Sequence, residues 1–331
     1  MNLFILKRFI LCLLACIFLL IVAMADSLPG HQEGFDYVLT EEGAVVTGWD
    51  NWSDETAKPV LYVPSVLGEQ PVVGIGNAAL ETAWHGPQFQ TFEIVIPEGV
   101  VYLEQRAFED CCHATTIYLP STLRVIPEDC FFHVTAEIVF PKGSPFFVVT
   151  DGFLIEQKSS TLLYAAPSSY TAPLPLVKRL GNSSLDNWLY ERTEVILPPT
   201  LESIGEFVFY DVADISHVAL PNSIEHIASR AFFGTGLKTV VLPARLTEIP
   251  AYCFCDCSIS AITIPNGVTH IGEYAIYRNW DAIETVILPT TVQFVGHNAF
   301  PEETSVIALS QDTHFETAEE YQLRCPEGKL W

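Results

Sequence analysis

The sequence is poor in positive charge. Its 331 residues include 16 Lys and Arg against 40 Asp and Glu, which gives a formal net charge of −24 at pH 7. A surface of this kind repels nucleic acid and anionic membranes, so we expect no nucleic-acid partner. The acidic residues are dispersed and form no long block, which is typical of a solvated surface rather than of an acidic tail.

Long apolar runs are also scarce, and the one that stands out lies at the N-terminus. It extends from residue 9 to residue 22, follows Lys7 and Arg8, and ends just before an Ala-Met-Ala cleavage sequence at residues 23–25. This order is that of a secretory signal peptide, which we assign to residues 1–25, and the run is too short for a comfortable membrane span. Its removal takes two positive charges away and lowers the formal charge from −24 to −26. We expect a secreted or cell-surface protein with no membrane contact after cleavage; an uncleaved or lipid-linked anchor is the alternative.

The short motifs of common enzyme classes are missing. The sequence contains no G-x-S-x-G, no H-E-x-x-H, no phosphate-binding loop and no G-x-G-x-x-G that opens a helix. Serine, histidine and carboxylate side chains abound, but a repeat surface lacks the strained turn and the oxyanion donors that a nucleophilic triad requires. We therefore expect neither catalytic activity nor a cofactor, and keep an extracellular hydrolase as the least favoured hypothesis.

A repeat of about 23 residues runs through most of the chain. In each copy, apolar residues stand one and three places before a marker proline, as Val195 and Leu197 do before Pro198. This alternation is typical of a strand, which the proline ends because it has no N–H to donate. A second apolar pair follows three and six places after the proline, and a small residue with an aromatic follows at ten and eleven. The marker positions are Pro64, Pro97, Pro120, Pro141, Pro175, Pro198, Pro221, Pro243, Pro265, Pro289 and, in the last copy, Ser310.

Self-similarity at this period indicates a solenoid, whose units bury their apolar faces only against their neighbours. We expect a mostly β solenoid of about ten coils, each of about 22 to 24 residues, over residues 60–310. Residues 144–173 interrupt the period and predict an inserted β-hairpin with its turn around residues 158–160. Residues 26–59 and 311–331 are expected to cap the two ends, because an open end coil exposes core and unpaired backbone.

The copies resemble one known family. A typical copy reads ITIPNGVTHIGEYAIYRN from Ile262 and is similar to the I-P-x-x-V-x-x-I-G-x-x-A-F-x-x-C pattern of the BspA-like leucine-rich repeats. The resemblance covers about residues 35–325 and includes Asp-Gly-Phe-Leu at residues 151–154. It implies a leucine-rich-repeat solenoid of secreted or surface proteins, several of which act in adhesion, and it implies no catalytic residues. A protein-interaction or adhesion module is thus our main hypothesis, and a structural component of a surface complex is the second.

One position of the repeat predicts a binding surface. The residue two places before each proline points away from the predicted core, and stacking of the coils would align these residues into one stripe. We call this set the apolar stripe: Val95, Tyr118, Val139, Ile196, Ala219, Val241, Thr263 and Ile287. A contiguous apolar patch of that length usually marks a partner surface. We therefore predict that Val95, Tyr118, Val139, Ile196, Val241 and Ile287 contact a host, matrix or surface protein, or a second copy of the chain. The alternative is that the insertion or a cap covers part of the stripe.

A second column predicts charged side chains in register. Five places after the proline stand His226, Glu248 and His270 in three successive coils. Two imidazoles and one carboxylate can form a metal site. The same order also arises when unlike groups simply stand opposite one another on a solvated ladder, and this second interpretation is the one we adopt.

The cysteines have two interpretations as well. The segment Cys253-x-Cys255-x-Cys257 matches no spacing of a structural zinc site, and neither does the cluster at residues 111–113. In an exported chain, a disulfide among Cys112, Cys255 and Cys325 is the stronger expectation.

Overall fold

The computed structural model describes residues 29–50, 60–81, 91–186, 188–189, 192–279 and 283–324. Over these residues the chain is a mostly β solenoid of about nine turns with a repeat of about 23 residues. Two compact units are present: unit 1 consists of residues 1–130 and 139–144, and unit 2 of residues 131–138 and 145–331. The signal peptide assigned to residues 1–25 lies outside the described residues.

Unit 1 begins with an antiparallel meander that turns into a parallel ladder. The meander is made of β1 (Pro29–Gln32), β2 (Phe35–Leu39) and β3 (Ala44–Trp49). β3 then pairs in parallel with β6 (Gln70–Ile75), which pairs with β8 (Tyr102–Leu103) and, on its antiparallel side, with β5 (Val66–Leu67). A second parallel ladder holds β4 (Val60–Tyr62), β7 (Phe92–Val95) and β9 (Ala114–Tyr118). The change from antiparallel to parallel pairing marks the first coil of the solenoid.

The insertion in unit 2 contains the predicted hairpin and one strand more. β11 (Phe147–Thr150), β12 (Phe153–Glu156) and β13 (Thr161–Ala165) form an antiparallel sheet, with the second turn at residues 157–160. The additional turn is at Asp151 and Gly152, both of which have positive φ. β13 also pairs in parallel with β14 (Arg179–Leu180), so the last strand of the insertion is the first of the following ladder.

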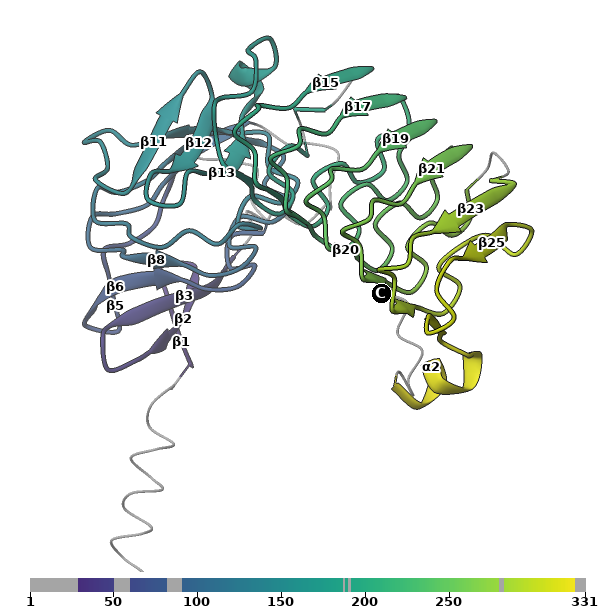
Figure 1. The fold of residues 1–331 in the computed structure, drawn as a ribbon. Coiled ribbons are helices and arrows are strands. Elements are labelled where there is room, and N and C mark those ends of the chain that lie inside the picture. Colours follow the sequence, from purple (N-terminus) through teal and green to yellow (C-terminus); the bar gives the residue numbers. More distant parts are fainter. Residues whose placement is uncertain are drawn as a thin grey trace, which may run out of the picture. The chain divides into compact units, whose positions relative to one another are not determined.

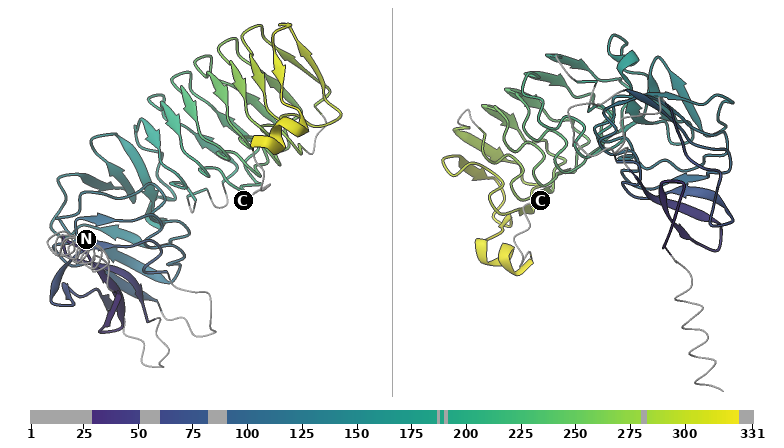
Figure 2. Two further views of the ribbon diagram at one scale, coloured as in Figure 1. Left: turned by 90° about the horizontal axis from the view of Figure 1, so that it is seen from below. Right: turned by 180° about the vertical axis from the view of Figure 1, so that it is seen from behind.

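Two rows of parallel strands, called the first and second ladder, run along unit 2, one on each side of the core; hydrogen-bonded strand pairing is interrupted at intervals along each row. The first consists of β14, β16 (Ser203–Ile204), β18 (His226–Ile227), β20 (Glu248–Ile249), β22 (His270–Ile271), β24 (Phe294–Val295) and β26 (His314–Phe315). The second consists of β15 (Glu194–Ile196), β17 (His217–Ala219), β19 (Thr239–Val241), β21 (Ala261–Thr263), β23 (Thr285–Leu288) and β25 (Ser305–Ala308), whose arrows lie side by side in Figures 1 and 2. These strands carry the residues that precede the marker prolines.

The last coil of the second ladder is displaced by one residue from its expected position. Leu288 pairs with Ala308, so Leu309 and not Ser310 stands opposite Pro289. The coil has no proline to mark its corner, and it is shorter than the repeat. After β26 the chain ends its described part in helix α2 (Ala318–Arg324), which buries none of its residues. Within the described ranges, no helix is both long enough and apolar enough to cross a membrane.

A stack of aromatic rings forms the centre of unit 2. The rings of Phe209 and Phe232 lie 4.7 Å apart and those of Phe232 and Phe254 5.2 Å apart, nearly parallel in both pairs. All three side chains are fully buried. A small residue precedes two of these rings, Ala231 in one coil and Cys253 in the next, and both are fully buried, since only a small side chain fits where the backbone turns inward. Each of these three coils thus adds one ring to the core, and in the next coil the buried Ile276 takes the same place.

Candidate interaction surfaces

The apolar stripe of unit 2 lies on the outer face of the second ladder. Ile196 is 86% exposed, Val241 81% and Ile287 56%, whereas the residues immediately before and after each of them are buried. Alternation along a strand sends neighbouring side chains to opposite faces, which explains this contrast. Ala219 and Thr263 pair with Ile196 and Val241 in register and are exposed as well. The insertion does not cover these side chains.

The surroundings of the stripe in unit 2 carry little charge. On the same face, two places earlier in each strand, stand Glu194, His217, Thr239, Ala261, Thr285 and Ser305, all exposed. Glu194 is the single carboxylate among them. On a chain with a net charge of −24, this face is therefore unusually free of acidic groups.

Unit 1 carries its own part of the stripe, which is less exposed. Tyr62, Val95 and Tyr118 are paired in register across β4, β7 and β9, and Val95 and Tyr118 are half-buried. The hydroxyl of Tyr118 donates to the carboxylate of Glu93 in the neighbouring strand at 3.3 Å. Val139 is 36% exposed, and its carbonyl accepts a 2.8 Å hydrogen bond from the N–H of Leu119.

Two members of the stripe were not predicted. Tyr62 of β4 is well exposed and precedes Pro64 by two places, so the pattern itself could have identified it. Ile307 of β25 is 47% exposed and pairs with Ile287. Ile307 was not predicted because the last coil is displaced by one residue: the position two places before Ser310 is Ala308.

The His and Glu column does not gather a metal site. Glu248 and His270 stand opposite each other in β20 and β22, while His226 stands opposite Ser203 in β16. Among the described residues, no three His, Cys, Asp or Glu side chains are grouped so that they could hold a metal ion. The Nδ1 atom of His270 instead lies 2.9 Å from the hydroxyl of Thr269.

The described cysteines of unit 2 are buried free thiols. Cys253, Cys255 and Cys257 are at most 3% exposed, and the Cys257 thiol donates to the carbonyl of Phe232 at 3.1 Å. Burial raises the pKa of Cys255 to about 12 and that of Cys257 to about 11. The expected disulfide through Cys255 is thus wrong, because the aromatic core encloses the thiol; Cys325 lies outside the described residues.

Three aromatic rings and one guanidinium form a column on the turn side of unit 2, where the turns follow the strands of the first ladder. Phe207, Arg230, Tyr252 and Tyr274 occupy the same place in successive coils, nine after the proline, and all have φ between 54° and 59°. The Cζ atom of Arg230 lies 6.0 Å from the ring centre of Phe207 and 4.8 Å from that of Tyr252. The rings of Tyr252 and Tyr274 are stacked at 5.0 Å. Large side chains recur nine places after the proline in the sequence, so this column could have been predicted from the repeat.

A second guanidinium is held at the end of α2. Arg324 donates from Nε and Nη2 to the two carboxylate oxygens of Glu316, at 2.9 and 3.1 Å, and from Nη2 to Glu273 at 2.9 Å. Its Cζ atom lies 5.4 Å from the ring centre of Tyr321. Two carboxylates and one aromatic ring therefore enclose one planar cation. Burial acts to raise the pKa of Glu316, but the hydrogen bonds from Arg324 and from the N–H of His297 outweigh it, so that pKa is lowered.

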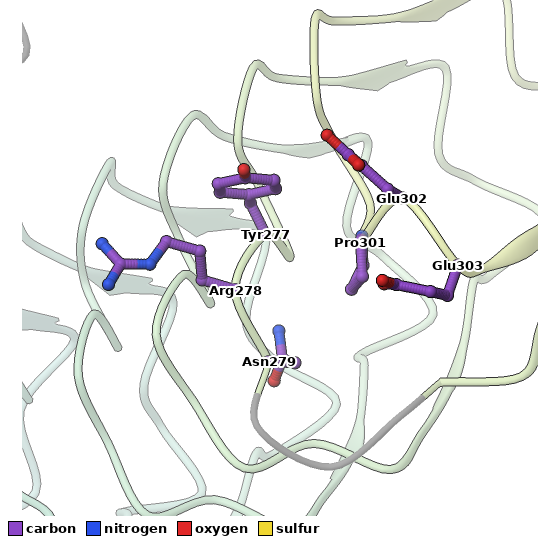
Figure 3. A pocket seen from close by; sticks show the side chains of 6 residues that line it. All are labelled: Tyr277, Arg278, Asn279, Pro301, Glu302 and Glu303. Atoms are coloured by element: carbon purple, nitrogen blue, oxygen red, sulfur yellow. The ribbon is translucent and has the colours of Figure 1, made fainter.

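A hollow opens on the same side of unit 2, one coil before the end. Its volume is about 280 Å³, and Figure 3 shows the six residues that line it: Tyr277, Arg278, Asn279, Pro301, Glu302 and Glu303. Nε of Arg278 lies 3.2 Å from a carboxylate oxygen of Asp256. Asn279 is fixed by a hydrogen bond from the N–H of Ile259 at 2.8 Å. The remaining polar groups are two exposed carboxylates and a phenol.

Comparison with solved structures shows likeness to bacterial repeat proteins. The pneumococcal vaccine antigen PcpA is 14% identical over 89% of this chain and 92% of its own, with a TM-score of 0.44. A leucine-rich repeat protein from Bacteroides ovatus is 21% identical over 86% and 68%, with a TM-score of 0.42. A leucine-rich cell surface protein from Faecalibacterium prausnitzii is 14% identical over 89% and 97%, with a TM-score of 0.37. No curated protein matches the chain.

The family comparison is more specific. The model described as BspA type leucine rich repeat region matches residues 87–144 and 178–320 in six copies. These ranges cover more than half of the 331 residues and include the strands of the second ladder of unit 2. The chain therefore belongs to the BspA-type leucine-rich repeat family.

Proposed function

We propose that the protein is an exported module that binds another protein through the apolar stripe of unit 2 and has no catalytic activity of its own. Proteins of this repeat family generally bind proteins and are generally not catalysts. The observation that supports the binding face is the exposure of Ile196, Val241, Ile287 and Ile307 on one row of strands. Apolar side chains that contribute nothing to the core and lie in line are typical of a partner surface. Export is supported by the signal sequence at residues 1–25.

The partner that fits this face is a protein with an uncharged, apolar surface strip. The strongly acidic surface elsewhere attracts basic groups and repels acidic ones, but the stripe and its flanks in unit 2 include only Glu194 as a carboxylate. Hydrogen-bonded strands lie about 4.8 Å apart, so the exposed side chains of paired coils follow one another closely along the row. Apolar burial is then the main attractive force, because few ion pairs can form there.

The test replaces the stripe without touching the core. A variant with Ile196→Ser, Val241→Ser and Ile287→Ser should keep its unfolding free energy within about 0.5 kcal/mol per site, since all three side chains are exposed. Binding to a panel of purified matrix and surface proteins, measured on a biosensor, should become weaker by on the order of tenfold or more for the partner that wild type captures.

The matched control carries Leu176→Ser and Leu323→Ser, two equally exposed aliphatic residues outside the stripe. It should bind as wild type does. If the control loses binding as fully as the stripe variant, the interaction follows general surface hydrophobicity. If the stripe variant binds as wild type does, the proposed face is wrong.

The second candidate function is a structural component of a surface assembly. The same exposed row would then meet a second copy of the chain, because an apolar, uncharged face is the place where two highly acidic molecules repel each other least. Sedimentation equilibrium separates the two functions. A concentration-dependent dimer that the triple serine variant abolishes would favour assembly over capture of a different protein.

A further inference from the structure

We propose that the hollow beside Tyr277 binds the guanidinium group of an arginine side chain presented by a protein partner. This site lies on the turn side of unit 2 and shares no residue with the apolar stripe. It is therefore independent of the function proposed above.

The groups around the hollow are those that a planar cation requires. Glu302 and Glu303 are exposed carboxylates, and Tyr277 contributes a half-buried ring. Carboxylates accept paired hydrogen bonds from a guanidinium, and the face of a phenol ring attracts it. A volume of about 280 Å³ suits one side chain rather than a large cofactor.

Another part of unit 2 already binds a guanidinium between two glutamates and a tyrosine. Arg324 is enclosed by the carboxylates of Glu316 and Glu273 and by the ring of Tyr321. The hollow offers the same three groups, two glutamates and one tyrosine, without an arginine between them. One unit thus shows a bound guanidinium and, at the hollow, a second set of two glutamates and one tyrosine among the lining residues.

Among the described residues that line the hollow, the one cation is paired with another group. Arg278 lines the hollow, but its Nε lies 3.2 Å from Asp256, and Figure 3 shows the side chain directed away from Glu302 and Glu303. In the part of the chain that the structure describes, neither glutamate forms an ion pair. Two carboxylates without a counter-charge, on an acidic protein, favour a cation from another molecule.

Arginine is favoured over lysine because of the ring. Arg230 and Arg192 both lie over aromatic rings of this protein, with Cζ 4.8 Å from the ring centre of Tyr252 and 3.5 Å from that of Trp188. A guanidinium is flat and weakly hydrated, so it stacks on a ring while its N–H groups bond to carboxylates. An ammonium group cannot make both contacts in this way.

The test uses two labelled peptides of equal charge, acetyl-Gly-Arg-Gly-Arg-Gly-amide and its lysine counterpart, titrated with the mature chain by fluorescence anisotropy. The arginine peptide should bind at least about threefold more tightly. Tyr277→Leu should weaken the arginine peptide by about threefold and remove its advantage over the lysine peptide. Glu302→Gln with Glu303→Gln should weaken it by on the order of tenfold. Both glutamates are exposed, so this double variant keeps its fold.

Two controls separate the hollow from general attraction to an acidic surface. Asp214→Asn with Asp312→Asn removes the same charge at exposed positions away from the hollow, and Tyr210→Leu removes an exposed ring that does not line it. Both should change arginine-peptide affinity by less than about twofold. Equal binding of the two peptides, or equal losses in the hollow variants and their controls, would overturn the proposal.

Discussion

Arg324 donates a 2.9 Å hydrogen bond to Glu273, a residue 51 positions earlier in the chain. Helix α2, which carries Arg324, buries none of its own residues. The contacts of Arg324 with Glu273 and Glu316, together with the ring of Tyr321 against those of His297 at 4.9 Å and Tyr274 at 5.9 Å, help to attach this helix to the coils. The contacts of Arg324 are ionic, so their strength depends on protonation.

Acid should release α2 before it unfolds the coils. The pKa of Glu316 is lower in the folded protein than its ordinary value of 4.5, so the stabilisation is present above about pH 4.5 and disappears as the pH falls through the lower, folded value. Amide chemical shifts of α2 followed by NMR should report this transition. In Arg324→Met the acid transition of α2 should be weaker and lie at higher pH, because only the N–H of His297 still lowers the pKa of Glu316; an unchanged profile would contradict the assignment.

The glycines seven places after the proline should resist any side chain. A Cβ atom at Gly272 would lie 2.4 Å from the backbone nitrogen of Ala251, and one at Gly296 2.4 Å from that of Glu273. Gly272→Ala should therefore destabilise the protein by about 1–3 kcal/mol in chemical denaturation. Ala228 holds the same place in another coil, and Ala228→Gly should cost only about 0.5–1 kcal/mol. Equal losses would show that close backbone approach is not the cause.

The ring stack in the core should be far more sensitive than the rings outside it. Phe232 touches the rings of Phe209 and Phe254 and is fully buried, so Phe232→Ala should cost about 3–5 kcal/mol of unfolding free energy. The adjacent Phe233 is half-buried and stacks on Tyr210 alone, so Phe233→Ala should cost about 1 kcal/mol. Similar values for the two variants, measured by urea unfolding, would mean that the stack is not the central support.

The thiols should differ in reactivity by position. Burial raises the pKa of Cys253, Cys255 and Cys257, which keeps these thiols protonated and unreactive at neutral pH. Cys112 is half-buried, and its pKa is raised less. Timed alkylation followed by peptide mass spectrometry should therefore modify Cys112 first, and the other three only after denaturant is added. Early labelling of Cys253 would contradict the buried core.

Export should leave a defined N-terminus. The Ala-Met-Ala sequence at residues 23–25 precedes a charged residue, so mass spectrometry of the secreted protein should begin at Asp26. Retention of the full chain in the membrane fraction would favour the uncleaved anchor instead. Ala25→Arg should block processing, since signal peptidase requires a small residue there.

The periodic part of the fold follows directly from the sequence. Alternation before each proline, as in Val240 and Leu242, determines which face of a strand is buried, and a one-residue error would expose both side chains. In the last coil no proline marks the end of the strand, and the predicted register was wrong by one residue: Leu309, not Ser310, stands opposite Pro289. The strand β11 was missed because its exposed valines do not alternate with polar residues.

The sites that cross between coils could not be predicted in the same way. The hollow that Tyr277 lines together with the glutamates at 302 and 303 depends on how far the turns of two coils project, which the repeat pattern does not specify. The ion pair of Arg278 with Asp256 likewise depends on a side-chain rotamer. The place of Arg230 between two rings was accessible in principle, because all three residues occupy one position of the repeat.

The ladders of unit 2 give its surfaces a fixed unit of length. Each coil contributes one residue to every column and advances the solenoid by about 4.8 Å. Deleting or duplicating one whole coil would therefore shorten or lengthen the row of exposed side chains by one step while leaving the remaining neighbours in register. A gene that gains or loses a repeat can in this way adjust the reach of a binding face without redesigning it, and a partner of defined length would select among such variants.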